Sequence, residues 1–320
     1  MRKRWLGLVL LGVTALAIAQ EDKVLRVDVN LVNLFFTVRE KKGALIGNLN
    51  KDDFTVYEDG KEQTIKSFNR EADLPLTIGL LIDVSGSQAN LIEIEKSAAI
   101  QFFNRVLRPK DMAFLISFGP EAELLQDYTN SPKLLSAGLN GLRVSSGVGG
   151  FGPGPVPTAS KPRGTILFDA VSLAATEKLK SEVGRKAIVL ITDGVDQGSR
   201  YTREKAIEAA QRSDSIIYSI YYVDYAAYGG RFGGMGMGVT DGDLRKMSEE
   251  TGGRVFKVDR NNSLQQIFDQ LQQELRTQYA ISYTPTNSNK DGTFRKVEIR
   301  TTHKEAKVQA RKGYYAANGR

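Results

Sequence analysis

The chain has 320 residues, of which 41% are hydrophobic and 25% charged, a composition typical of a soluble globular protein with one large or two modest domains. It contains no cysteine, which excludes a disulfide framework and a lipidated cysteine. The formal net charge is +7, but the basic side chains are scattered with no aromatic residues interleaved among them. We therefore expect no nucleic-acid binding.

Residues 1–19 have the pattern of a secretory signal peptide. Three basic residues within the first four are followed by an apolar run that ends in Ala17-Ile18-Ala19. The run is shorter than the roughly 20 residues that a membrane-spanning helix needs. We expect cleavage and no stable membrane span afterwards, the alternative being an uncleaved anchor. The protein is predicted to be exported, and to be periplasmic, secreted or located at the cell surface.

Both ends of the chain are predicted to contain strands without long helices. Residues 24–38 alternate between apolar and polar side chains, as in a long strand, and residues 54–57 and 64–68 have the pattern of a hairpin. Near the other end, three more strands are predicted at residues 279–283, 295–301 and 307–311. Neither end has enough strands to bury a core alone. We predict that residues 20–73 and 278–320 pair into one smaller, sandwich-like β-domain.

Residues 74–277 alternate between strands and helices, which predicts an α/β fold with a doubly wound, mostly parallel six-stranded sheet. The strands are expected at residues 76–83, 112–118, 124–125, 185–193, 216–223 and 255–258. Helices are expected over residues 91–106, 131–142, 165–180, 202–213, 240–251 and 263–275. Two glycine-rich loops, at residues 145–164 and 225–238, interrupt this segment and border the carboxyl edge of the predicted sheet.

Oxygen-bearing side chains follow two of the buried strands. Asp83, Ser85 and Ser87 come at the end of the first strand, and Asp193 comes at the end of the strand at residues 185–193. Thr165 opens a helix in between. In open α/β sheets the carboxyl ends of the strands meet at one edge, where ligands bind. Carboxylate and hydroxyl oxygens suit Mg²⁺ or Mn²⁺, so together these residues predict a metal site.

Each of these side chains also has a simpler interpretation. Ser85, Ser87 or Thr165 could cap a helix, and Asp193 could close an Asx turn. Asp196 is either an acceptor behind the site or a solvated turn residue. We favour the metal site because five independent caps are not expected to converge on one edge.

In this order and at these spacings, the five residues resemble the metal-ion-dependent adhesion site of von Willebrand factor type A domains. The resemblance covers roughly residues 74 to 277, and the flanks resemble the bacterial VWFA-related proteins described from acidobacteria. It implies that Ser85, Ser87 and Thr165 lie near the ion, and that Asp83 and Asp193 fix it directly or through water. Because Mg²⁺ prefers six oxygens, we expect a protein partner to complete the shell with an Asp or Glu carboxylate.

The sequence therefore predicts an exported protein that mediates metal-dependent protein binding or adhesion and is not an enzyme. Tyr228, Phe232 and Met235 of the second glycine-rich loop are expected to contact the partner. The alternatives are a metal-dependent hydrolase and a structural module of an envelope assembly with a stabilising metal. Against catalysis, the only histidine is His303, in the C-terminal segment, so no Ser-His pair is expected near the site.

Overall fold

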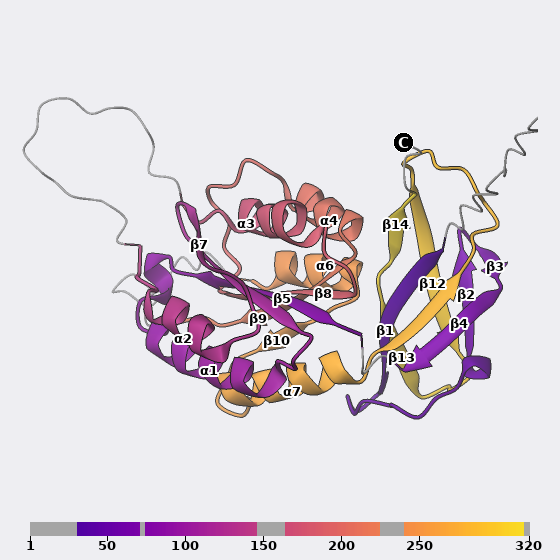
Figure 1. Ribbon diagram of the computed structural model, residues 1–320, viewed down its shortest axis with the longest axis horizontal. Helices are drawn as coiled ribbons and strands as arrows, with labels where there is room; N and C mark the ends of the chain where they lie inside the picture. Colours follow the sequence, from indigo (N-terminus) through magenta and orange to yellow (C-terminus); the bar gives the residue numbers. More distant parts are fainter. Residues whose placement is uncertain (1–30, 71–73, 146–163, 225–239, 317–320) are drawn as a thin grey trace, which may run out of the picture.

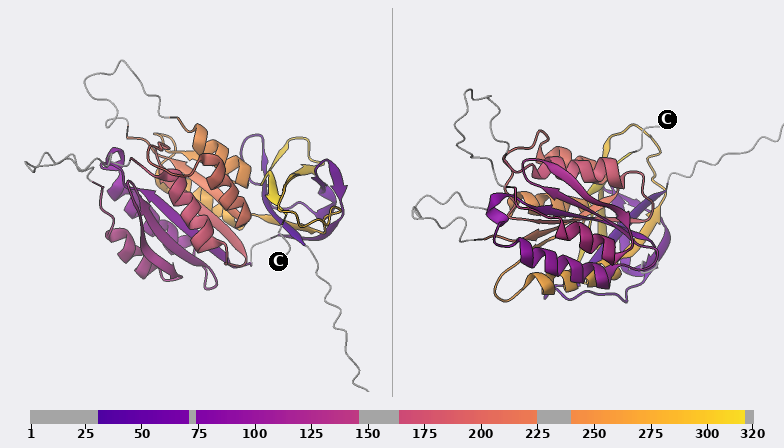
Figure 2. Two further views of the ribbon diagram at one scale, coloured as in Figure 1. Left: turned by 90° about the horizontal axis from the view of Figure 1, so that it is seen from above. Right: turned by 60° about the vertical axis from the view of Figure 1, so that its left-hand side comes forward.

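The computed structural model describes residues 31–70, 74–145, 164–224 and 240–316. Within them the chain forms an α/β part and a smaller β part, which lie side by side in Figure 1 and in the left view of Figure 2. The expected signal peptide, the loop at residues 225–238 with Tyr228, Phe232 and Met235, and nearly all of the loop at residues 145–164 lie outside the described residues.

A six-stranded sheet forms the centre of the α/β part, with the strand order β10-β9-β8-β5-β6-β7. Its strands are β5 (Leu76–Asp83), β6 (Met112–Phe118), β7 (Ala122–Thr129), β8 (Arg185–Thr192), β9 (Ser215–Tyr221) and β10 (Val255–Lys257). Every neighbouring pair is parallel except β6 with β7, which is antiparallel. The predicted mostly parallel six-stranded sheet is confirmed.

Helices cover both faces of this sheet (Figure 1). On one face lie α1 (Ile92–Val106), α2 (Pro132–Asn140) and α7 (Leu264–Arg276), and on the other lie α3 (Leu167–Leu173), α4 (Arg203–Arg212) and α6 (Gly242–Thr251). After α3 the chain continues as a π-helix over Ala174–Leu179, where a single α-helix was expected. Every residue of β5 and β8 is buried, which explains their nearly continuous apolar sequences.

The centre of β5 contains a glycine because the neighbouring strand fills its space. A Cβ atom on Gly79 would lie 2.3 Å from the ring of Phe114 in β6. No side chain larger than hydrogen fits there without moving the ring. Gly79 and Phe114 are register partners, so the ring packs against the glycine of the strand that ends at Asp83.

The β part is built from both ends of the described chain and forms two antiparallel sheets, with the orders β13-β1-β11-β4 and β14-β12-β2-β3. From the N-terminal side come β1 (Val32–Glu40), β2 (Phe54–Glu58), β3 (Lys61–Gln63) and β4 (Ile65–Arg70). From the C-terminal side come β11 (Tyr279–Tyr283), β12 (Phe294–Thr301), β13 (Ala306–Ala310) and β14 (Gly313–Tyr315). In Figure 1 the indigo and yellow strands accordingly lie side by side. The predicted sandwich-like β-domain made from both segments is confirmed.

The predicted hairpin between residues 54–57 and 64–68 is wrong in its second strand. β2 pairs with the short strand β3, whereas β4 pairs with β11 in the opposite sheet. The chain leaves β3 at Thr64 and changes sheet there. This brings the ring of Phe68 to 5.6 Å from Phe54 and from Tyr279 in the core between the sheets, which a simple hairpin would not allow.

Two buried side chains of the α/β part form hydrogen bonds at its junction with the β part, near the amino edge of the sheet. The guanidinium of Arg185, 2% exposed, donates to the carbonyls of Leu74, at 3.1 Å, and Leu275, which lie at the two passages between the parts. The carboxylate of Glu274 accepts from Arg39 of β1 and, at 2.8 Å, from Gln309 of β13. The exact domain boundaries, at residues 73/74 and 277/278, stay a prediction.

Candidate metal site

Asp83 ends the central strand β5 and is fully buried. One carboxylate oxygen accepts the hydroxyl of Thr192 at 2.6 Å, and the other accepts the backbone N–H of Ser85 at 2.9 Å. Burial raises the pKa of Asp83 to about 6, although these hydrogen bonds oppose the rise. The side chain is thus held in one orientation in a place where a cation would favour its charged form.

Ser85 and Ser87 connect Asp83 to Asp193 across the sheet edge. Their hydroxyls lie 3.0 Å apart, and the hydroxyl of Ser87 donates to a carboxylate oxygen of Asp193 at 2.6 Å. Ser85 precedes a 3-10 turn over Gly86–Gln88, but its side chain makes no cap hydrogen bond there. The arrangement therefore differs from the helix caps that were the alternative interpretation of the two serines.

Asp193 directly follows β8 and is 1% exposed. Its second carboxylate oxygen accepts the backbone N–H of Val195 at 3.1 Å, so it does close the Asx turn that the sequence allowed. The turn uses one oxygen and leaves the other facing Ser87. The turn and the position at the site are therefore compatible.

Thr165 reaches the same edge through its backbone. Its carbonyl accepts the N–H groups of Gln197 and Gly198, both at 3.0 Å, in the loop after β8, and the next residue, Ile166, donates to the carbonyl of Gly119 after β6 at 2.9 Å. Among the described residues, its hydroxyl makes no hydrogen bond to the other four predicted ligands. The structure thus joins four of the five in one hydrogen-bonded chain, and it bonds Thr165 to the loop that follows Asp193.

Asp196 accepts hydrogen bonds from two other positions, as the first of its two interpretations expected. One carboxylate oxygen accepts the backbone N–H of Phe168 at 3.2 Å, in the first turn of α3, and the hydroxyl of Ser199 at 2.5 Å. It therefore fastens the loop after β8 to the start of α3. By doing so it supports the position of Thr165, which directly precedes that helix.

Sequence reasoning missed Thr192 and Glu95. Thr192 is the last residue of β8, and its hydroxyl both donates to Asp83 and accepts the N–H of Gly194 at 3.1 Å. The sequence feature that could have identified Thr192 is a polar residue in a strand predicted to be fully buried. Glu95 lies in the first turn of α1 and is fully buried; the signal was an acid on the apolar face of a helix.

The donor set of this edge fits a small hard cation. It offers two carboxylates and three hydroxyls and no nitrogen or sulfur ligand, which suits Mg²⁺ or Mn²⁺ better than Zn²⁺. Within the described residues there is no cluster of three or more His, Cys, Asp or Glu side chains with the geometry of a metal site. A cation here would therefore depend on hydroxyl ligands as well as on the two aspartates.

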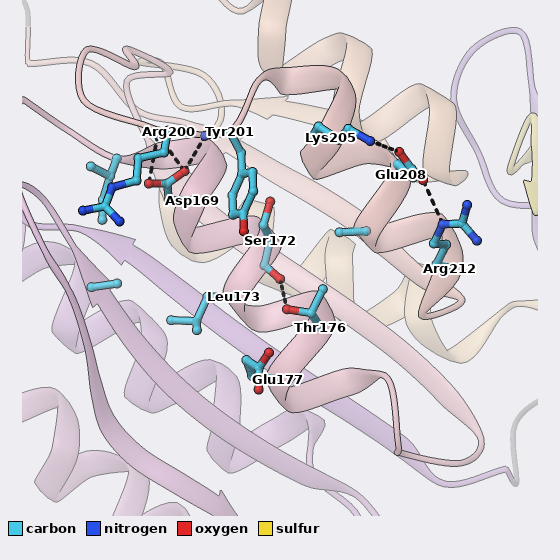
Figure 3. A pocket seen from close by; sticks show the side chains of 13 residues that line it. Asp169, Ser172, Leu173, Thr176, Glu177, Arg200, Tyr201, Lys205, Glu208 and Arg212 are labelled. Atoms are coloured by element: carbon cyan, nitrogen blue, oxygen red, sulfur yellow. Dashed lines mark hydrogen bonds and ion pairs between the residues drawn. The ribbon is translucent and has the colours of Figure 1, made fainter.

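A cavity of about 590 Å³ lies beside this edge, between α3 and α4 (Figure 3). None of the five predicted ligands lines it, although Ile166, the neighbour of Thr165, does. Three of its charged side chains are paired within the wall, since Glu208 bonds both Lys205 and Arg212, each at 2.9 Å. The cavity is thus a neighbouring surface and not the place where the predicted ligands meet.

Residues 158–270 match the von Willebrand factor type A domain. The chain contains a von Willebrand factor type A domain. The matched residues include Thr165 and Asp193, whereas Asp83, Ser85 and Ser87 precede them. Among curated proteins, none matches the sequence.

Several solved structures are similar to parts of this chain at low sequence identity. An aerotolerance-related membrane protein from Bacteroides fragilis matches with 17% identity and a TM-score of 0.46, over 62% of this chain and 98% of that chain. BatB from Bacteroides thetaiotaomicron matches with 18% identity and a TM-score of 0.46, over 62% and 97%. Proximal thread matrix protein 1 from the mussel byssus, in a structure with a zinc-occupied MIDAS motif, matches with 15% identity and a TM-score of 0.49, over 68% and 50%.

No helix among the described residues is both long enough and apolar enough to cross a bilayer.

Proposed function

We propose that the type A domain binds a divalent cation, Mg²⁺ or Mn²⁺, through Asp83, Ser85, Ser87, Thr165 and Asp193. The observation that carries this proposal is the hydrogen-bonded chain from Asp83 through Ser85 and Ser87 to Asp193 at the carboxyl edge of the sheet. Without a cation, two buried carboxyl groups lie at one edge, which is costly unless charge is compensated. A bound cation would supply that compensation.

We further propose that the cation recruits a protein partner. Domains of this family commonly take part in protein–protein interaction. The five side chains leave an octahedral ion with room for another ligand, because Mg²⁺ prefers six oxygens and keeps several waters. A carboxylate from an Asp or Glu of the partner would fill this position with a charge opposite to that of the ion. The protein would act in this way after export, in the periplasm, in the medium or at the cell surface.

Binding is favoured over catalysis by the position of the only histidine. His303 lies in the β part, where its Nε2 atom is 3.3 Å from a carboxylate oxygen of Asp53. It is thus on the far side of the molecule from Asp83, since the β part adjoins the amino edge of the α/β sheet (Figure 1). No His base is therefore available to the serines of the site.

Calorimetric titration with Mg²⁺ tests the metal site. Wild type is expected to bind one ion, and Asp83→Ala is expected to bind none. Asp52→Ala, which removes an exposed aspartate in the β part, is the matched control and should bind like wild type. Thermal unfolding of each variant shows whether the fold is intact. Unchanged Mg²⁺ affinity in a folded Asp83→Ala protein would contradict the assignment.

Capture from an envelope extract tests the recruitment of a partner. The immobilised protein should retain a partner in Mg²⁺, release it in EDTA, and fail to retain it when Asp83 is replaced by Ala. The purified partner should then lose its affinity when a single Asp or Glu is neutralised. If the partner is retained equally with and without EDTA, metal-dependent recruitment is refuted. The metal would then have only a stabilising role.

A further inference from the structure

A third acidic side chain is buried at the edge of the sheet where the proposed metal ligands lie. Helix α1 begins just after the loop that carries Ser85 and Ser87, and Glu95 lies in its first turn. The Glu95 side chain is 0% exposed, and neither of its carboxylate oxygens has a hydrogen-bond partner among the described residues. A buried carboxyl group without a partner is rare and calls for a physical reason.

Gln88 adds a second buried acceptor from the same loop. It is also 0% exposed, and its side-chain N–H group donates to the carbonyl of Tyr222, just after β9, at 3.4 Å. Its side-chain oxygen has no hydrogen-bond partner among the described residues. Glu95 in turn acts electrostatically on Tyr222, so both side chains lie near the residue that follows β9. The loop and helix thus supply three buried oxygen atoms. When Glu95 is ionised, all three are hydrogen-bond acceptors and none is a donor.

The charges that act on Glu95 are those of the proposed metal ligands. Burial is the largest cause that raises the pKa of Glu95 well above its ordinary value, and Asp83 and Asp193 raise it further. All three groups are acidic, so none offsets the negative charge of another. In a purely structural role, an apolar residue would serve better here, as Ala98, Ala99 and Phe102 do along the same helix.

We propose that Glu95 supplies a third negative charge to the cation site, acting on the ion through that charge and not as a ligand. This inference rests on the proposed metal site and deepens it. A third negative charge strengthens the hold on a divalent cation, because it adds attraction in an interior where charges are weakly screened. The same charge opposes an incoming carboxylate. Glu95 therefore sets a balance between binding the ion and binding the partner.

Glu95→Gln tests this inference, because it removes the charge and keeps the size. Glu93→Gln is the matched control: Glu93 lies in the same helical turn but is exposed and bonded to Lys96. In calorimetric titration with Mg²⁺, Glu95→Gln should bind on the order of tenfold to a hundredfold more weakly than wild type. Glu93→Gln should bind like wild type.

Stability of the metal-free protein supplies a second readout. Glu95→Met replaces the carboxyl group with an apolar side chain of similar length, so its melting temperature in EDTA should be equal to or above that of wild type. It should show the same weakened Mg²⁺ affinity as Glu95→Gln, which separates loss of charge from loss of fold. Wild-type affinity in either folded variant would overturn the role of Glu95. Failure of wild type itself to bind Mg²⁺ would instead overturn the proposed function on which the role depends.

Discussion

Replacing Asp83 with Asn should make the metal-free protein more stable above pH 6. Burial raises the pKa of Asp83 from its ordinary value of 3.8 to about 6. The native state therefore holds this proton more tightly than the unfolded state does, and the stability of wild type falls as the pH rises between these two values. Above pH 6 the ionised carboxylate lowers the stability by its full amount. Asn stays neutral at every pH, so the variant does not lose this stability.

The magnitude follows from the pKa. A tenfold change in the protonation equilibrium corresponds to about 1.4 kcal/mol, so a rise from 3.8 to about 6 corresponds to a loss of about 3 kcal/mol. Roughly half of this, about 1.5 kcal/mol, should develop between pH 5 and pH 8, because the unfolded group is already ionised at pH 5. Besides burial, Asp83 raises the pKa of Glu95, so the change in Glu95 titration forms part of the measured difference.

Urea unfolding followed by circular dichroism, in EDTA at pH 5, 6, 7 and 8, measures this difference directly. The stability of Asp83→Asn relative to wild type should increase across the series. Excess Mg²⁺ at pH 8 should restore wild type, by about 2.7 kcal/mol at a concentration 100 times the dissociation constant, and should not stabilise the variant. A stability difference that does not change with pH would refute the buried, proton-binding state of Asp83.

Three further predictions concern the support of the site and the fold. Thr192→Val removes the hydroxyl that orients Asp83 and should weaken Mg²⁺ binding at least about tenfold in calorimetry, whereas equal affinity would show that this hydrogen bond is dispensable. Gly79→Ala places a Cβ atom against Phe114 and should cost about 1–3 kcal/mol in urea unfolding; a neutral effect would mean that the ring moves freely. Deleting residues 278–320 should abolish the protection of β1 in amide exchange, and retained protection would show that the N-terminal strands fold alone.

The central strands and the order of the oxygen-bearing residues were predictable from sequence because they depend on local patterns. An apolar run such as β5 is buried on both faces wherever it lies in the chain, and parallel strands bring their ends to one edge. The position of Asp83 follows from these two rules. The fold class follows equally from the alternation of strands and helices.

The remaining features depend on contacts between segments far apart in sequence. Nothing local indicates that β4 leaves the sheet of β2, because its partner β11 comes more than 200 residues later. Similarly, the bond from Thr192 to Asp83 joins residues of two neighbouring strands, and a threonine at a strand end has many other uses. Glu95 stands at a position where the helix pattern predicts an apolar residue. The pattern shows that an acid is unusual there, but it does not indicate what the acid does.

Arg185 has a consequence for the order in which the chain folds. Its guanidinium fastens both passages between the two parts, at Leu74 and Leu275, but its own strand β8 becomes ordered only within the α/β sheet. Pairing β4 with β11 across a flexible chain of about 200 residues has a large cost in loop-closure entropy. If the domain between them is already folded, its ends are fixed and this cost no longer opposes the pairing. We expect the type A domain to fold first and template the β part, and Arg185→Met to slow the appearance of protected amides in β1 more than in β5. During synthesis, β1 to β4 would then keep unpaired edges until the C-terminal strands are made. We expect the chain to be most prone to aggregation during this interval.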